Sequence, residues 1–408
     1  MWEALLDRML KSLLRVGTLE LHMPSGHVGR YGDGMAPEVT VRLHDPAILR
    51  RLVLSPDLGV GEGYMDATLT IDDDDLHGFL QIAMRNMATD QPLRWRRLVR
   101  NSRAAIRWLA QFNPAGRARA NVAHHYDLSG ELYDLFLDAD KQYSCGYFRS
   151  PDDTLEQAQA QKKAHIAAKL LIEPGMRVLD IGCGWGGMAL TLARDHGAKV
   201  VGVTLSEEQI KIARQRAEAE GLSERVEFRF QDYRSVTGQF DRIVSIGMFE
   251  HVGVPHYREF FRHVHDMLTE DGVALIHTIG RTEPPGSTNP WMAKYIFPGG
   301  YIPAISEAMA AVEKEQLWPA DIEIWRLHYA ETLRHWEQRF SANIERARAL
   351  YDDRFCRMWW FYLVACEQAF RYNWQCVFQF QLARRRDAVP LTRDYLYREA
   401  PPLRAAAE

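Results

Sequence analysis

The sequence lacks an apolar run long enough to form a membrane-spanning helix. The longest such run, from Met358 to Cys366, is well short of the roughly 20 residues that span a bilayer and ends at Glu367. Charged residues are scattered among the apolar ones at the start of the chain, unlike the core of a signal peptide. We therefore expect a soluble, cytoplasmic protein whose first residues form an amphipathic helix.

The sequence also has few cysteines and no excess of positive charge. Its five cysteines are odd in number, lie far apart and include no C-x-x-C pair of the kind that holds zinc. Reduced thiols and no metal site are expected. A formal net charge of -4 argues against general nucleic-acid binding. No internal repeat is visible.

Positive charge is nevertheless concentrated between Gln91 and Ala120, which contains eight arginines and no acidic residue. Trp95, Trp108 and several aliphatic residues are interleaved with these arginines. A basic, tryptophan-bearing amphipathic segment is suited to lying on anionic lipid, which predicts peripheral association with the inner face of the membrane. A solvated helical linker explains the same composition equally well.

The length of 408 residues with 47% apolar content predicts two domains. A helix-breaking run at Asn113–Gly116 suggests the boundary. We expect a smaller α+β domain over 1–115, a larger domain over 116–390 and a tail over 391–408. The acidic run Asp72–Asp75 is expected to cap a helix, because it lacks the ligand spacing of a calcium loop. The elements expected in the first domain are strands at 18–22 and 39–43 and helices at 46–54 and 76–87.

From residue 177 onward, strand and helix patterns alternate, which predicts an α/β domain with a parallel sheet. Ligands of such sheets bind at the carboxyl ends of the strands. The expected strands are 177–181, 199–203, 226–230, 240–246 and 272–277, and the expected helices are 188–195, 207–219 and 256–268.

The first predicted strand of this domain runs into a D-x-G-x-G-x-G turn formed by Asp180, Gly182, Gly184 and Gly186. Glycine lets the backbone approach a ligand closely, and the acid can accept hydrogen bonds from a cationic or hydroxyl-bearing group. A dinucleotide site would instead have G-x-G-x-x-G and an acid about 20 residues later. The pattern resembles the S-adenosylmethionine turn of Rossmann-like methyltransferases, which implies that these four residues bind that cofactor. A purely structural turn is the alternative.

A more specific resemblance follows at the ends of the next two strands. Thr204, Leu205 and Ser206, followed by Gln209, are similar to the corresponding segment of the cyclopropane synthases that act on bacterial phospholipids and on mycolic acids. The resemblance assigns the ribose contact to Thr204, Ser206 and Gln209. It places Gln231, Asp232 and Tyr233 near the adenine, with a turn acid as the alternative role for Asp232.

Four further segments carry the resemblance, which covers the region from Asn121 to about Arg384. They are His125–Tyr147, Met248–Gly253, His277–Gly280 and Tyr329 with its neighbours. The resemblance implies that Tyr143 and Ser144 touch the cofactor. It also implies a bound bicarbonate held by the side chains of Cys145, Glu250, His277 and Tyr329 and by the backbone of Ile279. Taken singly, each of these would more often be an ordinary buried residue, and the sequence does not decide whether Glu250 or the adjacent His251 faces the site.

The implied activity is transfer of a methylene group from S-adenosylmethionine to the cis double bond of an unsaturated acyl chain in a membrane phospholipid. The steps are methyl transfer, carbocation formation and bicarbonate-assisted deprotonation with ring closure. Gly61–Asp66 resembles the lipid-binding N-terminal domain of the phospholipid enzymes, a domain that the mycolic-acid enzymes lack. The aromatic residues of 351–380 and the loop 295–301 are expected to wall a tunnel for the acyl group, with a plain apolar core as the alternative.

Three other functions remain open. The nearest is a methyltransferase that acts on a carbon atom of fatty acyl groups and leaves a methyl or methylene branch without ring closure. The others are a small-molecule methyltransferase and a non-catalytic lipid-binding protein. The sequence leaves undecided the double-bond position, the head-group preference, the stereochemistry and whether the protein is a homodimer.

Overall fold

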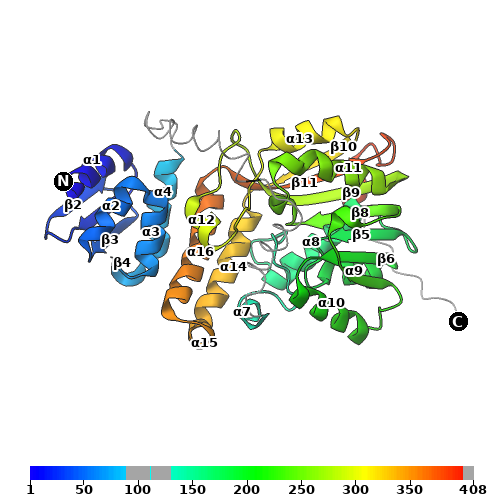
Figure 1. The fold of residues 1–408 in the computed structure, drawn as a ribbon, viewed down its shortest axis with the longest axis horizontal. Helices are drawn as coiled ribbons and strands as arrows, with labels where there is room; N and C mark the ends of the chain where they lie inside the picture. Colours follow the sequence, from blue (N-terminus) through cyan, green and yellow to red (C-terminus); the bar gives the residue numbers. More distant parts are fainter. Residues whose placement is uncertain (89–110, 112–129, 398–408) are drawn as a thin grey trace. The chain divides into compact units, whose positions relative to one another are not determined.

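The computed structural model describes residues 1–88, 111 and 130–397. Contacts between residues divide the protein into two compact units (Figure 1). The N-terminal region clusters with two later segments of the chain. Both segments lie within 116–390, the range expected for the larger domain. The expected boundary near residue 115 lies outside the described residues and stays a prediction. The first unit comprises residues 1–103, 287–298 and 329–375, and the second comprises 104–286, 299–328 and 376–408.

The first unit contains a sheet of four strands in the order β2-β1-β3-β4. β1 pairs antiparallel with β2 and parallel with β3. Leu19 and Leu21 of β1 are buried with Val39 and Val41 of β3, because alternate residues of a strand face the same side. The strands at 18–22 and 39–43 are thereby confirmed. The bounds are β1 (Thr18–His22), β2 (Val28–Gly32), β3 (Glu38–Leu43) and β4 (Leu69–Ile71).

Helices complete the first unit, and the two that the sequence predicted there are confirmed residue for residue. The carboxylate of Asp75 accepts a hydrogen bond from the backbone N–H of Gly78, so the acidic run does cap a helix. The helices are α1 (Trp2–Leu13), α2 (Pro46–Leu54), α3 (Pro56–Met65), α4 (Leu76–Met87), α12 (Pro290–Tyr295), α14 (His328–Ala342), α15 (Ile344–Leu350) and α16 (Asp353–Tyr372).

Helix α3 was not predicted, because its three glycines lower intrinsic helix propensity. The structure explains them by close packing. A Cβ atom on Gly59 would lie 2.8 Å from the backbone of Arg51, and one on Gly61 would lie 2.4 Å from the ring of Trp291. A Cβ atom on Gly63 would lie 2.4 Å from the side chain of Ile48. The glycines therefore let α3 approach its neighbours closely.

The second unit is built on a sheet of seven strands in the order β10-β11-β9-β8-β5-β6-β7. The five strands from β9 to β7 are parallel, and β10 pairs antiparallel with β11. This confirms a Rossmann-like α/β fold. The strands are β5 (Arg177–Ile181), β6 (Lys199–Thr204), β7 (Val226–Phe230), β8 (Phe240–Ile246), β9 (Leu268–Arg281), β10 (Trp318–Trp325) and β11 (Gln375–Ala383).

Helices cover both faces of this sheet (Figure 1). Apolar residues of α8, α9 and α10 form one core against it, and those of α11 and α13 form the other. The strand order reverses between β5 and β8, which is the position where ligands of open α/β sheets bind. The helices are α7 (Gly130–Asp134), α8 (Leu155–Lys169), α9 (Gly187–His196), α10 (Glu207–Ala219), α11 (Tyr257–Met267) and α13 (Ile305–Lys314).

Aromatic residues of 351–380 are buried in both units. Phe378 and Phe380 of β11 join the core beneath α11, while Trp359 and Tyr362 are buried on α16. Core packing accounts for these four, and the tunnel for the acyl group stays a prediction. The arginine-rich segment lies almost wholly outside the described residues. Among the residues that are described, no helix is both long and apolar enough to cross a membrane.

Candidate cofactor and active site

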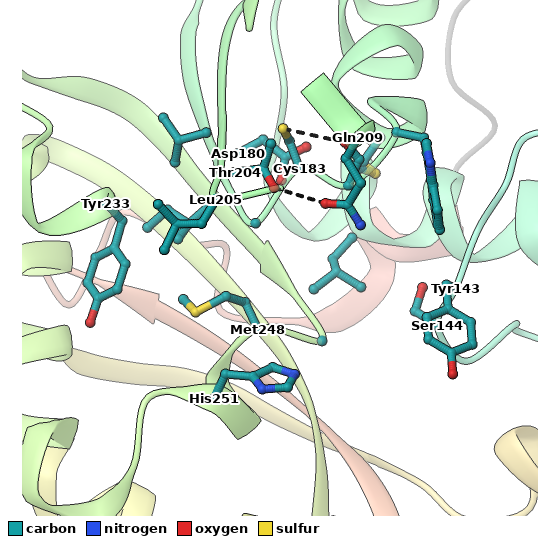
Figure 2. A pocket seen from close by; sticks show the side chains of 18 of the residues that line it. Tyr143, Ser144, Asp180, Cys183, Thr204, Leu205, Gln209, Tyr233, Met248 and His251 are labelled. Atoms are coloured by element: carbon teal, nitrogen blue, oxygen red, sulfur yellow. Dashed lines mark hydrogen bonds between the residues drawn. The ribbon is translucent and has the colours of Figure 1, made fainter. Parts of the chain in front are cut away.

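A pocket opens at the carboxyl ends of β5, β6, β7 and β8 in the second unit (Figure 2). Ten of the twelve residues predicted to bind the cofactor line it. They are Tyr143, Ser144, Asp180, Gly182, Gly184, Thr204, Gln209, Gln231, Asp232 and Tyr233.

The glycine turn after β5 lines part of the pocket. Gly182 and Gly184 have positive φ angles of 79° and 54°, which side-chain-bearing residues rarely adopt. A Cβ atom on Gly184 would meet no protein atom within 4 Å, so a side chain there would enter the pocket. The turn thus leaves room for a ligand to lie against the backbone.

Gly186 and Ser206, the other two predicted contacts, are not among the lining residues, and each has a structural role. Gly186 starts α9 with a φ of 85°, and a Cβ atom there would lie 2.6 Å from the ring of Phe228. Ser206 caps α10, where its hydroxyl accepts a hydrogen bond from the N–H of Gln209. Their direct contact with a cofactor stays a prediction.

Asp180 is the most unusual group in the pocket. Its side chain is buried, and its Oδ2 atom has no hydrogen-bond partner in the described structure. Burial raises the pKa of Asp180 to about 7, because the charged form loses its hydration. A cation placed beside this carboxylate would restore the lost stabilisation. The ammonium group of S-adenosylmethionine has the charge and the donors that this position requires.

Two predicted ribose ligands are already joined to each other. The hydroxyl of Thr204 donates to Oε1 of Gln209 over 2.9 Å (Figure 2). The pair presents an amide and a hydroxyl to the pocket, which are neutral partners for hydroxyl groups of a sugar.

Gln231, Asp232 and Tyr233 follow β7, and Asp232 does act as a turn acid. Its carboxylate accepts hydrogen bonds from the backbone and the guanidinium of Arg234. Burial opposes ionisation of Asp232, but Arg234 outweighs it and lowers the pKa. The amide of Gln231 donates to the backbone oxygen of Ser235. All three nevertheless border the pocket, so the turn role and a ligand role are compatible.

The structure adds Met248 and His251 to the pocket lining (Figure 2). Burial lowers the pKa of His251 to about 4, so its imidazole is neutral near pH 7. His251 faces the cofactor pocket, whereas Glu250 turns toward the backbone of Ile279. The sequence had left open which of the two faces the site, since adjacent residues on an irregular segment carry no periodicity.

Glu250, His277 and Ile279 are not among the residues that line the cofactor pocket. Oε1 of Glu250 accepts a hydrogen bond of 2.6 Å from the N–H of Ile279, and Oε2 is buried without a partner in the described structure. Burial raises the pKa of Glu250 to about 7. Its carboxyl can therefore carry a proton near neutral pH and donate it in a hydrogen bond.

His277 lies two residues before Ile279 on β9 and so faces the same side of the sheet. Burial lowers the pKa of His277 well below its usual value, and nearby lysines lower it further. The amide nitrogen of Gln379 donates to Nδ1 of His277 over 3.1 Å. With this amide nitrogen as the donor, the neutral ring would carry its proton on Nε2 and could donate it from there.

The other two side chains predicted to bind the anion are those of Cys145 and Tyr329. Cys145 is buried, and its thiol donates to the backbone oxygen of Gly146. Tyr329 belongs to the other compact unit, where its ring contacts Trp336 and Phe370. Its place beside the anion stays a prediction. Within the described ranges, no group of three or more His, Cys, Asp and Glu side chains is arranged to hold a metal ion.

Known proteins match this protein along most of its length. The family described as mycolic acid cyclopropane synthetase matches residues 114–380. The cyclopropane-fatty-acyl-phospholipid synthase of Escherichia coli is 39% identical over 355 residues, covering 85% of this chain and 89% of that protein. A probable fatty acid methyltransferase of Pseudomonas putida is 39% identical over 288 residues, covering 68% of this chain and 73% of that one.

Among solved structures, the mycolic acid cyclopropane synthase CmaA1 in complex with SAH and CTAB superposes with a TM-score of 0.62. It is 33% identical and covers 67% of this chain and 99% of that one. SAH is the demethylated form of S-adenosylmethionine, and the glycine turn and Asp180 suit this cofactor. The chain belongs to the mycolic acid cyclopropane synthetase family and is an S-adenosylmethionine-dependent methyltransferase.

Proposed function

We propose that this enzyme transfers a methylene group from S-adenosylmethionine to the cis double bond of unsaturated acyl chains in membrane phospholipids and closes a cyclopropane ring. The observation that carries the proposal is the Glu250–Ile279–His277 group: the buried carboxyl of Glu250 accepts a hydrogen bond from the N–H of Ile279, and the buried His277 lies two residues earlier on the same strand. All three belong to the same unit as the cofactor pocket. Methyl transfer leaves a carbocation, so ring closure needs a base for the departing proton as well as the cofactor pocket.

The family resemblance and the name of the Escherichia coli relative support the phospholipid substrate. The match with that relative covers 85% of the chain, so it includes part of the N-terminal region as well as the methyltransferase domain.

The pocket serves the first step by orientation. The cofactor supplies a sulfonium methyl group, which is electrophilic enough for attack by the weakly nucleophilic double bond. Asp180 and the glycine turn fix the donor, and holding the reacting atoms in line can supply several kcal/mol of the barrier. The carbon–sulfur bond breaks as the new carbon–carbon bond forms, which leaves a positive charge on the acyl group.

The Glu250–Ile279–His277 group serves the second step. The new methyl group must lose a proton, and the electron pair of that C–H bond closes the ring. A bound bicarbonate would supply the base that accepts this proton. Its oxygens require donors, which the protonated carboxyl of Glu250 and Nε2 of His277 would provide. The N–H of Ile279, also expected to donate to the anion, donates to Glu250 in this structure. Cys145 and Tyr329 complete the proposed set.

Access to the lipid substrate is part of the proposal. The arginine-rich segment would lie on anionic lipid and hold the enzyme peripherally at the inner face of the membrane. Aromatic residues of 351–380 and of the loop 295–301 would wall the path of the acyl group, as apolar lipid sites usually require.

A second candidate is a methyltransferase that acts on a carbon atom of fatty acyl groups and leaves a methyl or methylene branch. It is favoured by the name of the Pseudomonas putida relative, which is also 39% identical. It shares the cofactor and the methyl-transfer step, and differs only in the fate of the carbocation.

Deuterium counting distinguishes these products. The enzyme is incubated with vesicles of monounsaturated phospholipid and S-adenosylmethionine whose transferable methyl group is fully deuterated, and the acyl groups are analysed by mass spectrometry. Cyclopropanation predicts acyl groups that retain two of the three deuterons and carry no olefin. A methylene branch also retains two but keeps an olefin, and a methyl branch retains all three. Either branched product would overturn the proposal, and saturated phospholipid serves as the control without a reactive double bond.

A further inference from the structure

Three lysines of helix α8 are buried or nearly so, and one of them lacks an acidic partner. Lys163 forms an ion pair with Asp140, and Lys169 forms one with Glu323. Lys162 is completely buried, yet it forms no ion pair within the described part of the protein. The charges of Asp138 and Asp140 act on it without forming an ion pair, and a buried ammonium whose charge is not fully compensated is costly. This arrangement therefore suggests that a ligand supplies the negative charge.

Two contacts place Lys162 directly behind the segment that lines the cofactor pocket. Its Nζ atom donates to the hydroxyl of Ser144 over 2.7 Å and to Oε1 of Gln142 over 2.8 Å. Ser144 and Gln142 both line the pocket. An ammonium has three donors, so these two bonds leave one for a further acceptor.

The same ammonium lies within electrostatic reach of the proposed anion ligands. Among the charges that act on Lys162, Asp138 is the strongest, and Cys145 follows after Lys163. Lys162 is in turn the strongest of the charged neighbours that depress the pKa of His277. Burial lowers the pKa of Lys162 itself to about 8, which shows that the surroundings of the apo site do not fully compensate the charge. An anion beside Cys145 and His277 would provide that compensation.

We propose that Lys162 is a positioning residue that joins the two halves of the site: its ammonium anchors Ser144 and Gln142 at the cofactor pocket and is the buried counter-charge of the bicarbonate. The inference rests on the proposed function, because it assigns a charge partner to the anion used in ring closure. It adds a residue that neither reacts nor accepts the proton, but raises the affinity of the anion and holds the segment 142–144 in place.

Lys162→Met tests the inference, since methionine is close to lysine in length and carries no charge. Three quantities are measured with the full-length enzyme: the bicarbonate concentration that half-saturates ring formation, the rise in Tm that bicarbonate causes, and the affinity for S-adenosylmethionine by calorimetry. We expect at least a tenfold increase in the half-saturating concentration, loss of the rise in Tm, and a severalfold weaker cofactor affinity. Lys162→Arg, which keeps the charge, should recover part of the bicarbonate response.

Lys163→Met is the matched control, because it removes the neighbouring cation but no contact with Ser144 or Gln142. It should leave the response to bicarbonate unchanged. If Lys162→Met fails to fold, Lys162→Gln provides the same comparison with a polar, uncharged side chain. A Lys162 variant that is uncharged and responds to bicarbonate as the wild type does would overturn the inference while the proposed function stands. A wild type that responds to bicarbonate in neither measurement would overturn the anion assignment and this inference together.

Discussion

At the residue scale, the role proposed for Asp180 predicts that cofactor binding depends on pH. Its buried carboxyl has a pKa of about 7 in the apo protein, so below that pH it is mostly protonated and cannot pair with an ammonium. Binding of S-adenosylmethionine must then release the proton. We expect the affinity, measured by calorimetry, to rise between about pH 5.5 and pH 7, and to level off as α-amino groups with ordinary pKa values of about 8 lose their charge.

Asp180→Asn should remove this pH dependence and weaken binding at pH 7.5 by about tenfold to a hundredfold, the usual value of a hydrogen bond to a charged group. An asparagine variant whose affinity still rises with pH would show that another group titrates.

Gly184 makes the second prediction at this scale. Gly184→Val should weaken cofactor binding at least about a hundredfold, because its side chain would project into the pocket. Gly221→Val is a matched control. Gly221 also has a positive φ, of 67°, and open space around it, but it lies after α10 and away from the pocket. Both variants bear the strain of a β-branched residue at positive φ. Equal cofactor affinity in the two would contradict the role of Gly184.

Single residues differ in how well the sequence predicts their roles. The position of the glycine turn and Asp180 at the pocket is predictable, because ligands of parallel sheets bind at the carboxyl ends of the strands. The roles of His251 and Glu250 are not, because a short irregular segment places neighbouring side chains in directions that only the fold determines. Lys162 gave no signal in the sequence, since helix α8 carries lysines on several sides and burial distinguishes them only in three dimensions.

At the scale of elements, the packing of helix α3 depends on the absence of side chains at its three glycines. Gly61→Ala would place a methyl group 2.4 Å from the ring of Trp291 in the same unit. We expect a loss of about 1–3 kcal/mol in the free energy of unfolding, which is typical of overpacking, and a lower Tm in calorimetry. Gly130→Ala is the control, because its nearest neighbour would be 4.0 Å away. A Gly61 variant as stable as the wild type would mean that α3 shifts freely.

The arginine-rich segment permits a separate prediction about membrane binding. Reversing the charge at Arg96, Arg97, Arg100 and Arg103 should weaken sedimentation with anionic vesicles, since each basic residue near the surface contributes about 1 kcal/mol. Affinity for the soluble cofactor should hardly change. Undiminished sedimentation would make the segment a linker.

At the scale of the whole molecule, the sequence predicts the five parallel strands of the second unit. Strand and helix periods identify β5 to β9 and the helices between them, because the parallel sheet repeats one pattern. The clustering of 287–298 and 329–375 with the N-terminal region joins segments far apart in the sequence. Periodicity within a segment carries no information about which distant segment it meets. Strands β2, β4, β10 and β11 were not predicted. β4 has only three residues, and β2 contains two glycines, which weaken a strand pattern.

The proposed function depends on the base that removes the proton, so the most direct measurement is ring formation by Glu250→Gln and His277→Ala as bicarbonate is varied. Cofactor affinity should stay near that of the wild type, while the rate of ring formation falls about a hundredfold or more, in the range that general acid–base groups contribute. Added bicarbonate should restore part of the rate where the substitution only weakens the anion, and stalled carbocations should yield traces of branched or hydroxylated acyl groups. If both variants instead form the ring at the wild-type rate in bicarbonate-depleted buffer, the Glu250–Ile279–His277 group does not hold the base.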